Sequence, residues 1–445
     1  MFNSKLHGCL IGLLLAIFFQ PSSADAEGRT DTQNLPLPVR MVLAKINPML
    51  QKKEYPRAAE TILAFQAEGK TVSEPGRPDP RGYHHPEIYF ALGNCHLMQE
   101  HYAPAAAAYR QAVTRDPCHT FAWLNLAKAC YEMKQYAEAG HGFAQGYETA
   151  RDKTPEHLYY SAASYLMADE PVRAIDFFER LLASHPTAFK PEWKEHLVHA
   201  LLAADQPRRA LPYIRELANA YSGDKRIQWQ EILLHQYLQL DMPGEALNLV
   251  LTLIREAPDA AKWWKALTHI RLNDGRYEEA LTALIVYSFL TPLSMEEKKL
   301  LADLNLQLGI PINAAPVYKT CLEEKPDEQL LQRLVLAYRQ LGLPETALEC
   351  IDTFGGNPND TDLLLLKGEL LYSLKQFEGA VAAYRRVAQS GGREAGRAWL
   401  MAGYAAWQMS DISASREAFT KAAGYAREKN AAVTALKQLP PESVQ

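Results

Sequence analysis

The stretch LGLPETA, residues 341–347, recurs along the chain in four altered copies. In every copy a proline stands three residues before an alanine. Proline suits the first turn of a helix, where its missing N–H would have no partner, and it breaks a helix interior. The motif therefore predicts a turn followed at once by a new helix. The other copies are ADEPVRA (168–174), ADQPRRA (204–210), LDMPGEA (240–246) and LGIPINA (308–314).

The alanine that closes this motif has a regular period. After a first gap of 46 residues, its steps along the chain are 34, 35, 36, 36, 34, 34, 33, 33 and 35. A period near 34 is typical of a repeat made of two helices. The positions are Ala59, Ala105, Ala139, Ala174, Ala210, Ala246, Ala280, Ala314, Ala347 and Ala380, with Ser415 in the last copy.

Other positions follow the same frame, and together they resemble the tetratricopeptide repeat. One copy has Tyr89, Leu92, Gly93, Ala105, Tyr109, Ala112 and Pro117 at the offsets of that family, and the next has Trp123, Leu126, Ala127, Ala139 and Phe143. The resemblance covers nearly all of residues 38–430. It implies an all-α fold, a right-handed α-solenoid of about ten to eleven helix–turn–helix units. Each pair is too small to bury its apolar face alone, so it must stack on its neighbours.

The first residues have the pattern of a cleavable secretory signal. Lys5 precedes an apolar run, Leu10 to Phe19, and Ala24-Asp25-Ala26 forms a small-residue cleavage site, so we expect cleavage after Ala26. Cys9 precedes the apolar run instead of following it, which argues against a lipid anchor. No later segment reaches 18 apolar residues, so we expect a periplasmic protein without a transmembrane segment after signal removal.

The remaining boundaries follow from the repeat and from proline and glycine content. We expect a signal peptide (1–26), a flexible leader (27–37), a degenerate helix pair (38–68), a loop insertion (69–85), ten repeats (86–427), and a C-terminal capping helix with a tail (428–445).

The composition narrows the class of partner and the cysteine chemistry. A net charge of −5 argues against nucleic acid as a partner. The cysteines after the signal are odd in number, and most lie in helical sequence, which favours buried apolar thiols, although a bridge from Cys95 to Cys130 stays open. They are Cys95, Cys118, Cys130, Cys321 and Cys350.

No catalytic or cofactor motif is present in the sequence, so we predict a protein that is not an enzyme and holds no cofactor. Histidine gives the one suggestive arrangement. His199, His235 and His269 share the ninth position of the first helix in three consecutive copies, with Glu195, Glu231 and Lys265 four residues before them. Glu192, His196, Lys262 and Lys299 are expected nearby.

Three interpretations of these histidines stay open. They could form a solvated polar groove, or a recognition strip for a polar peptide whose affinity changes as the imidazoles titrate. They could also bind a metal, although neighbouring helices about 8–10 Å apart do not readily bring imidazoles to one ion, and we predict no metal site.

A second stretch of the expected groove is apolar and aromatic. Phe90, Asn94, Leu124 and Tyr159 are candidates for contact with a partner helix or extended segment. Asn94 and Asn125 match positions at which some relatives grip a peptide carboxylate, but Phe90, Glu156 and Tyr160 stand where that clamp needs basic groups.

Residues 261–323 are similar to the exported tetratricopeptide proteins that accompany TonB–ExbB–ExbD systems, in helix pattern and in blocks such as LGIPINAA (308–315). The resemblance implies a periplasmic scaffold or adaptor for protein or peptide partners in the cell envelope, accessory to energy-transducing transport. The alternative is a scaffold for polysaccharide export or outer-membrane assembly. A metal-dependent enzyme that uses the groove histidines is the least favoured of the three.

Overall fold

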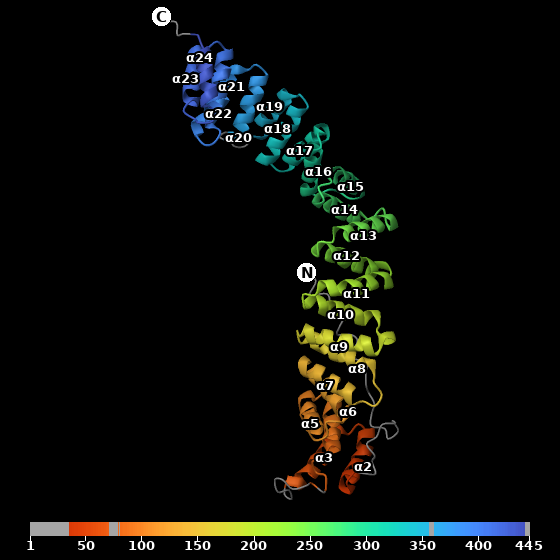
Figure 1. The fold of residues 1–445 in the computed structure, drawn as a ribbon. Helices are drawn as coiled ribbons and strands as arrows, with labels where there is room; N and C mark the ends of the chain where they lie inside the picture. The colour runs from red at the N-terminus through yellow and green to blue at the C-terminus, as the bar shows by residue number, and fades with distance from the viewer. Residues whose placement is uncertain (1–34, 71–78, 80, 356–359, 441–445) are drawn as a thin grey trace. The chain divides into compact units, whose positions relative to one another are not determined.

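The computed structural model describes residues 35–70, 79, 81–355 and 360–440, and this part of the chain is helical without a β-strand (Figure 1). It contains 23 α-helices, and 22 of them form eleven consecutive pairs joined by short turns. These pairs confirm the predicted all-α solenoid of helix–turn–helix units. The predicted signal peptide, the leader up to residue 34 and the last residues of the tail lie outside the described part.

The pairs are α2 (Leu37–Gln51) and α3 (Tyr55–Lys70), α4 (Pro86–Met98) and α5 (Tyr102–Arg115), α6 (Thr120–Glu132) and α7 (Tyr136–Thr149), α8 (Pro155–Met167) and α9 (Pro171–Ser184), α10 (Pro191–Ala203) and α11 (Pro207–Ala220), α12 (Gly223–Gln239) and α13 (Pro243–Glu256), α14 (Ala261–Asn273) and α15 (Tyr277–Leu290), α16 (Met295–Gln307) and α17 (Pro311–Glu324), α18 (Glu328–Gln340) and α19 (Pro344–Phe354), α20 (Thr361–Ser373) and α21 (Phe377–Ser390), and α22 (Ala395–Gln408) and α23 (Ile412–Ala422). A short 3₁₀ helix, η3 (Pro186–Ala188), follows α9, and α24 (Lys429–Gln438) follows the last pair.

Each of the eleven turns inside a pair contains one residue with positive φ. In ten of these turns, all but the one at Asp241, the next residue donates its N–H to a carbonyl five residues back, as Glu170 does to Tyr165 at 2.9 Å and Ile310 to Asn305 at 2.8 Å. This is the Schellman arrangement that ends a helix. The positive-φ residues are Lys53, Glu100, Lys134, Asp169, Asp205, Asp241, Gly275, Gly309, Gly342, Lys375 and Ser410.

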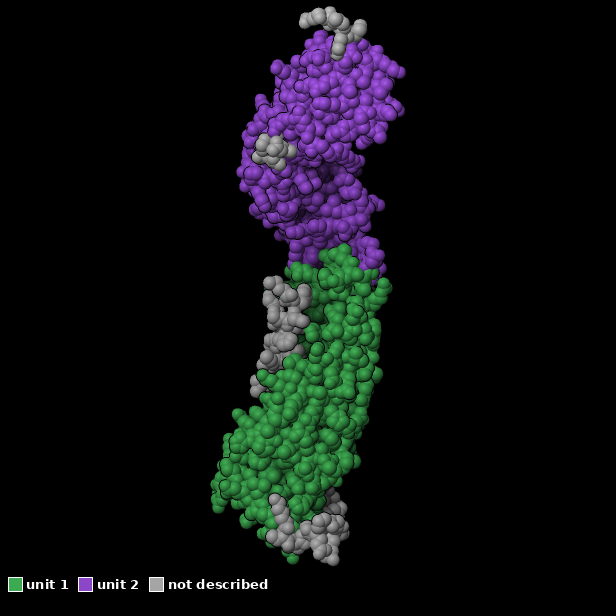
Figure 2. Space-filling view, turned by 90° about the vertical axis from the view of Figure 1, so that its left-hand side faces the viewer, with its two compact units in different colours: residues 1–240 green, residues 241–445 purple. Residues whose placement is uncertain are grey.

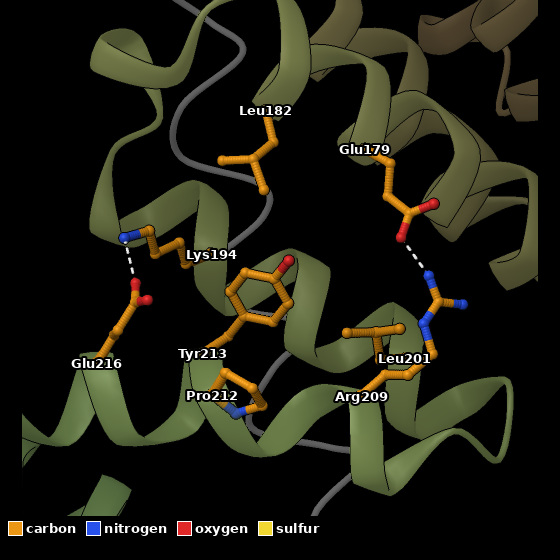
Figure 3. Close-up of a pocket in the computed structure, with 8 residues that line it drawn as sticks. All are labelled: Glu179, Leu182, Lys194, Leu201, Arg209, Pro212, Tyr213 and Glu216. Carbon is orange, nitrogen blue, oxygen red and sulfur yellow. Dashed lines mark hydrogen bonds and ion pairs between the residues drawn. The ribbon is translucent and has the colours of Figure 1, made fainter.

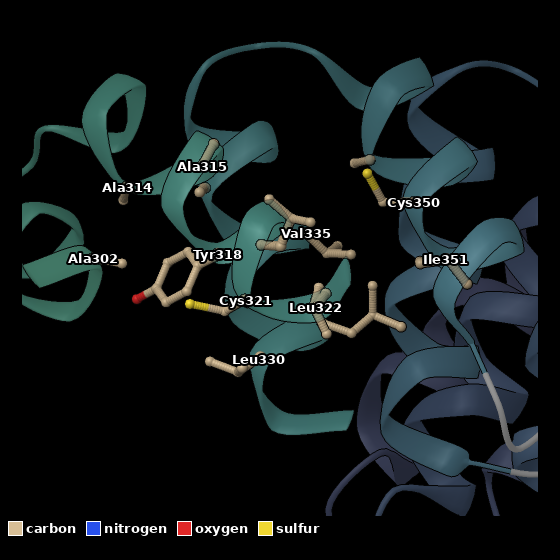
Figure 4. Packing of buried hydrophobic residues seen from close by; sticks show 14 of the residues in the cluster. Ala302, Ala314, Ala315, Tyr318, Cys321, Leu322, Leu330, Val335, Cys350 and Ile351 are labelled. Carbon is tan, nitrogen blue, oxygen red and sulfur yellow. The ribbon is translucent and has the colours of Figure 1, made fainter. Parts of the chain in front are cut away.

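The closing alanines form the seam of the core. All ten alanines and Ser415 are at most 5% exposed. The aromatic position four residues later is also fully buried in several repeats, as at Tyr109, Phe178 and Tyr318. Figure 4 shows this arrangement around Tyr318, whose ring lies with Ala302, Ala314 and Cys321 in one apolar cluster.

Several first helices carry a glycine where the aromatic ring of the second helix approaches the backbone. A Cβ atom on Gly93 would lie 2.5 Å from the ring of Tyr109, and one on Gly368 would lie 2.6 Å from the ring of Tyr384. These distances are too short for any side chain, so glycine is required for the two helices to pack.

The chain divides into two compact units, residues 1–240 (unit 1) and 241–445 (unit 2), shown in two colours in Figure 2. The division falls between α12 and α13, which belong to the same repeat by sequence. Each unit is described by itself below.

The ends of the described helices refine the sequence boundaries. Helix α3 continues to Lys70, so the predicted insertion begins two residues later than expected, and most of it (71–78 and 80) lies outside the described part. Tyr83, near its end, is buried and its ring lies 4.8 Å from that of Phe65. At the other end, Ala435 and Leu439 pack against Phe419 of the last repeat.

The five cysteines of the described part are free, so the bridge between Cys95 and Cys130 is not formed. Burial raises the pKa of Cys95 to about 11 and that of Cys130 to about 12. Both thiols therefore stay protonated and act as small apolar side chains. Cys118 differs because it is exposed.

Candidate functional site

We define the first-helix face of unit 1 as the surface formed by the first helix of each pair from α4 to α12. Along this face α4 contacts α6, and α8 contacts α10. Most of the candidate residues belong to this face. The others, Lys262, Lys265, His269 and Lys299, belong to unit 2, so the three histidines at the ninth position are divided between the two units.

An aromatic cluster joins α8 to α10 at the middle of the face. The rings of Tyr159 and Trp193 stack with centroids 4.7 Å apart and an angle of 15°. The hydroxyl of Tyr159 is hydrogen-bonded to Nδ1 of His196 at 2.9 Å. Tyr159 and Trp193 are buried, so this group of side chains fastens two consecutive repeats to each other.

His196 carries no charge at neutral pH. Burial lowers its pKa to about 4, and nearby His199 and Lys225 act in the same direction, against the opposing effect of Glu195. A neutral imidazole bonded to Tyr159 is a structural link between helices. It does not titrate in the range in which an ordinary histidine does.

Glu195 is also engaged inside the protein. Its carboxylate accepts a hydrogen bond from the Tyr221 hydroxyl and forms an ion pair with Lys225 Nζ at 2.5 Å. The Lys225 ammonium lies 4.0 Å from the centre of the Tyr221 ring. Glu195 therefore ties α10 to the start of α12.

The remaining candidates on this face are more open to solvent. Glu192, Glu231 and His235 are exposed, and His199 is partly buried. Glu231 and His235 lie one repeat after Glu195 and His199 in the same register. They lie on α12 and provide a carboxylate and an imidazole that a partner can reach.

In unit 2, two of the candidate lysines are partners of acidic groups on the following first helix or at its N-cap. Lys265 Nζ lies 2.7 Å from Glu297, and Lys299 Nζ lies 3.4 Å from Asp327. Burial would raise the pKa of Glu297, but hydrogen bonds from Lys265 and Ser294 lower it to about 2. These pairs link consecutive repeats.

Lys262 and His269 complete the candidates of unit 2. Both side chains are exposed on α14, and the Lys262 ammonium lies 4.7 Å from the centre of the Trp263 ring.

The predicted apolar stretch begins on α4. Asn94 Oδ1 accepts hydrogen bonds from the Tyr109 hydroxyl at 2.8 Å and from Asn125 Nδ2 at 2.9 Å. The two asparagines that match the peptide clamp of some relatives therefore bond to each other. The ring of Phe90 lies 4.7 Å from that of His119.

Leu124 is partly buried and lies over Gly146 of α7, because a Cβ on that glycine would come 2.3 Å from Leu124 Cδ2. Leu124, like Phe90, thus contributes to packing between helices as well as to the face.

A pocket of about 480 Å³ lies on a different part of unit 1, between α9, α10 and α11 (Figure 3). Two ion pairs stand on opposite sides of it: Glu179 with Arg209, and Lys194 with Glu216 at 2.6 Å. The Tyr213 ring lies between them, and burial with the two carboxylates raises the pKa of Tyr213. Leu182, Leu201 and Pro212 complete the lining.

The sequence did not indicate this pocket, because its residues come from three helices and share no repeat position. The one local signal is Pro212, a proline inside α11, which removes a helical N–H. An apolar floor with charged walls suits an apolar side chain of a partner.

Two features are absent from the described part of the chain: a group of metal-ligating side chains and a helix that could span a membrane. Within it, no three His, Cys, Asp or Glu side chains are grouped as metal ligands would be. Over the same residues, none of the helices combines the length and apolar character needed to cross a bilayer.

Comparison with family models gives the identity of the repeats. Models described as "Tetratricopeptide repeat" match residues 86–129, 158–188, 333–395 and 396–429. The segments that these models match are tetratricopeptide repeats. They lie in both units, and each contains helices of the eleven pairs.

Solved structures similar to this chain share little sequence with it. A tetratricopeptide repeat protein from Parabacteroides merdae is 16% identical over 56% of this chain and 98% of its own, with a TM-score of 0.31. MamA from Desulfovibrio magneticus is 20% identical over 38% of this chain and 97% of its own, with a TM-score of 0.33. Yeast Tom70 is 13% identical over 90% and 94%, with a TM-score of 0.29. No curated protein matched the chain.

Proposed function

We propose that this protein is an exported adaptor that binds segments of cell-envelope proteins along the first-helix face of unit 1. Proteins built of tetratricopeptide repeats typically act as binding scaffolds and not as enzymes, because stacked pairs present a long, repetitive surface. The export part of the proposal rests on the signal pattern of residues 1–26.

One observation supports the choice of face. Glu231 and His235 are exposed on α12, whereas their counterparts one repeat earlier, Glu195 and His199, are each partly buried. Exposed polar side chains on this helix are within reach of a partner. Many weak contacts of this kind add up along a repetitive surface.

The partner belongs, in this proposal, to a TonB–ExbB–ExbD system. The support is the resemblance of residues 261–323 to exported accessory proteins of such systems. The adaptor would connect the inner-membrane motor to uptake at the outer membrane.

Site-specific photocrosslinking in intact cells tests this function. A photoreactive amino acid replaces His235 on the face, and in a matched control it replaces Val172, which is exposed on α9. We expect a discrete adduct from position 235 that contains TonB, ExbB or ExbD, and no such adduct from position 172.

Two results would overturn the proposal. Identical adducts from both positions would remove the role of the first-helix face. Recovery of cytosolic proteins alone would remove the export assignment.

A further inference from the structure

Helix α2 has an apolar stripe on the side that faces away from the core. Its core side contains Val39 and Ile46, which are buried. On the opposite side Leu37 is 60% exposed and Met41 64% exposed. At 100° per residue, Ala44 and Pro48 continue the same stripe, and both are exposed. We call Leu37, Met41, Ala44 and Pro48 the outer stripe.

Cations border the outer stripe on both sides. Arg40 and Lys45 are exposed and lie about 70° to either side of its centre in a regular helix. Lys52 and Lys53 follow directly after α2 and are exposed too. Residues 35–53 contain these four cations and no Asp or Glu, although the whole chain has a net charge of −5. The surface is thus locally basic on an acidic protein.

This charge pattern differs from that of the surfaces on which repeats stack. Between consecutive second helices, three arginines meet a glutamate: Arg110 with Glu138, Arg180 with Glu148, and Arg209 with Glu179. The surface of residues 35–53 has cations and no acidic residue, so it does not have the paired charges by which these repeats meet each other. A second copy of α2 would bring Arg40 and Lys45 against like charges, which is unfavourable.

We propose that the outer stripe of α2 docks on the surface of an anionic lipid bilayer. An amphipathic helix with cations beside its apolar stripe lies in the plane of the interface, with the apolar side chains below the headgroups. Long Arg and Lys side chains reach up to the phosphates while their stems stay in the apolar layer. This role goes beyond partner binding and does not depend on the identity of the partner.

Vesicle co-sedimentation tests the proposal. The protein used in this assay is produced from Glu27 onward, because the apolar run Leu10 to Phe19 would itself bind lipid. Vesicles of phosphatidylcholine are compared with vesicles of phosphatidylcholine and phosphatidylglycerol at a ratio of about 70 to 30. We expect binding to the anionic vesicles only, weaker at about 0.5 M than at about 0.1 M salt because salt screens the cations.

Variants assign the binding to α2. Each surface cation contributes about a fivefold gain in affinity, so R40Q/K45Q should bind about 25-fold more weakly. L37S/M41S should lose about tenfold or more, because the apolar insertion is gone. The matched controls are I312S, at a residue 66% exposed on α17, and R393Q, at an exposed arginine before α22. Both should bind as the parent does.

All four variants change exposed side chains, so thermal unfolding should match that of the parent and shows whether each is folded. Absence of binding to anionic vesicles, equal binding to neutral vesicles, or equal losses in the α2 and control variants would each overturn the proposal. The proposal would also fail if, in sedimentation velocity, the parent protein is a dimer and L37S/M41S is a monomer. The outer stripe would then bind a second copy of the chain.

Discussion

At the scale of single residues, the turn inside each pair depends on one backbone conformation. Asp169, Asp205 and Lys375 adopt a left-handed φ that costs a residue with a side chain about 1 kcal/mol, whereas Gly309 reaches it without that cost. The Schellman bonds of the next residue repay the cost by satisfying the carbonyls at the helix end. Geometry matters more than residue type here, since Asp, Lys, Glu, Ser and Gly all occupy the position.

Gly309→Ala should therefore lower the free energy of unfolding by about 1 kcal/mol, since a Cβ there meets no atom within 4 Å and the penalty comes from φ alone. Gly244→Ala is the matched control, because Gly244 lies in the first turn of α13, has no positive φ and also has open space around it. Urea unfolding should show a loss for the first and none for the second. Equal losses would contradict the backbone explanation.

The sequence predicts where the turns and the closing alanines lie better than it predicts which side chains bond to each other. The closing alanines and the turns at Asp169, Asp205 and Gly309 follow from spacing and residue type, and the structure confirms both. A left-handed Lys134 has no such signal, because lysine is not a turn former. For the candidate site, the repeat register places His196 on a first helix but cannot reveal its bond to Tyr159, 37 residues away.

At the scale of helices, the two helices of a pair pack through an aromatic ring of the second helix that lies against a glycine of the first. Gly368 of α20 faces Tyr384 of α21, and Gly403 of α22 faces Phe419 of α23 in the same way. Such close approach lets the ring fill the seam without a cavity, and interiors this dense do not accept an added methyl group without movement.

Gly368→Ala should lower the free energy of unfolding by about 1–3 kcal/mol, because the new Cβ would lie 2.6 Å from the Tyr384 ring. A double-mutant cycle with Tyr384→Leu measures the coupling: the added methyl should cost less once the ring is gone. If the cost of Gly368→Ala is the same with tyrosine and with leucine at 384, the clash is not its cause.

At the scale of the whole molecule, contacts within each unit are local. Helices contact those next to them or one further along the chain, as α8 does with α9 and α10. Stability is then close to a sum of repeats and of the interfaces between neighbours. A weakened repeat should affect its neighbours and little else.

Hydrogen exchange measures this locality. In Gly368→Ala, amides of α20, α21 and α22 should exchange faster, whereas those of α4 to α9 should exchange at the parental rate. A uniform acceleration across both units would show that the chain opens as one cooperative body.

The left-handed turns also determine where the chain can accept extra length. Inside a pair, one added residue would move the left-handed position out of step with its Schellman bonds. The connection between pairs does not have to keep a fixed length, as the first gap of 46 residues shows. Gly391 and Gly392 form an exposed connection between α21 and α22; both have positive φ, but the Schellman bonds inside the pairs do not depend on them. A fluorescent reporter or new chain termini placed there would leave every repeat whole.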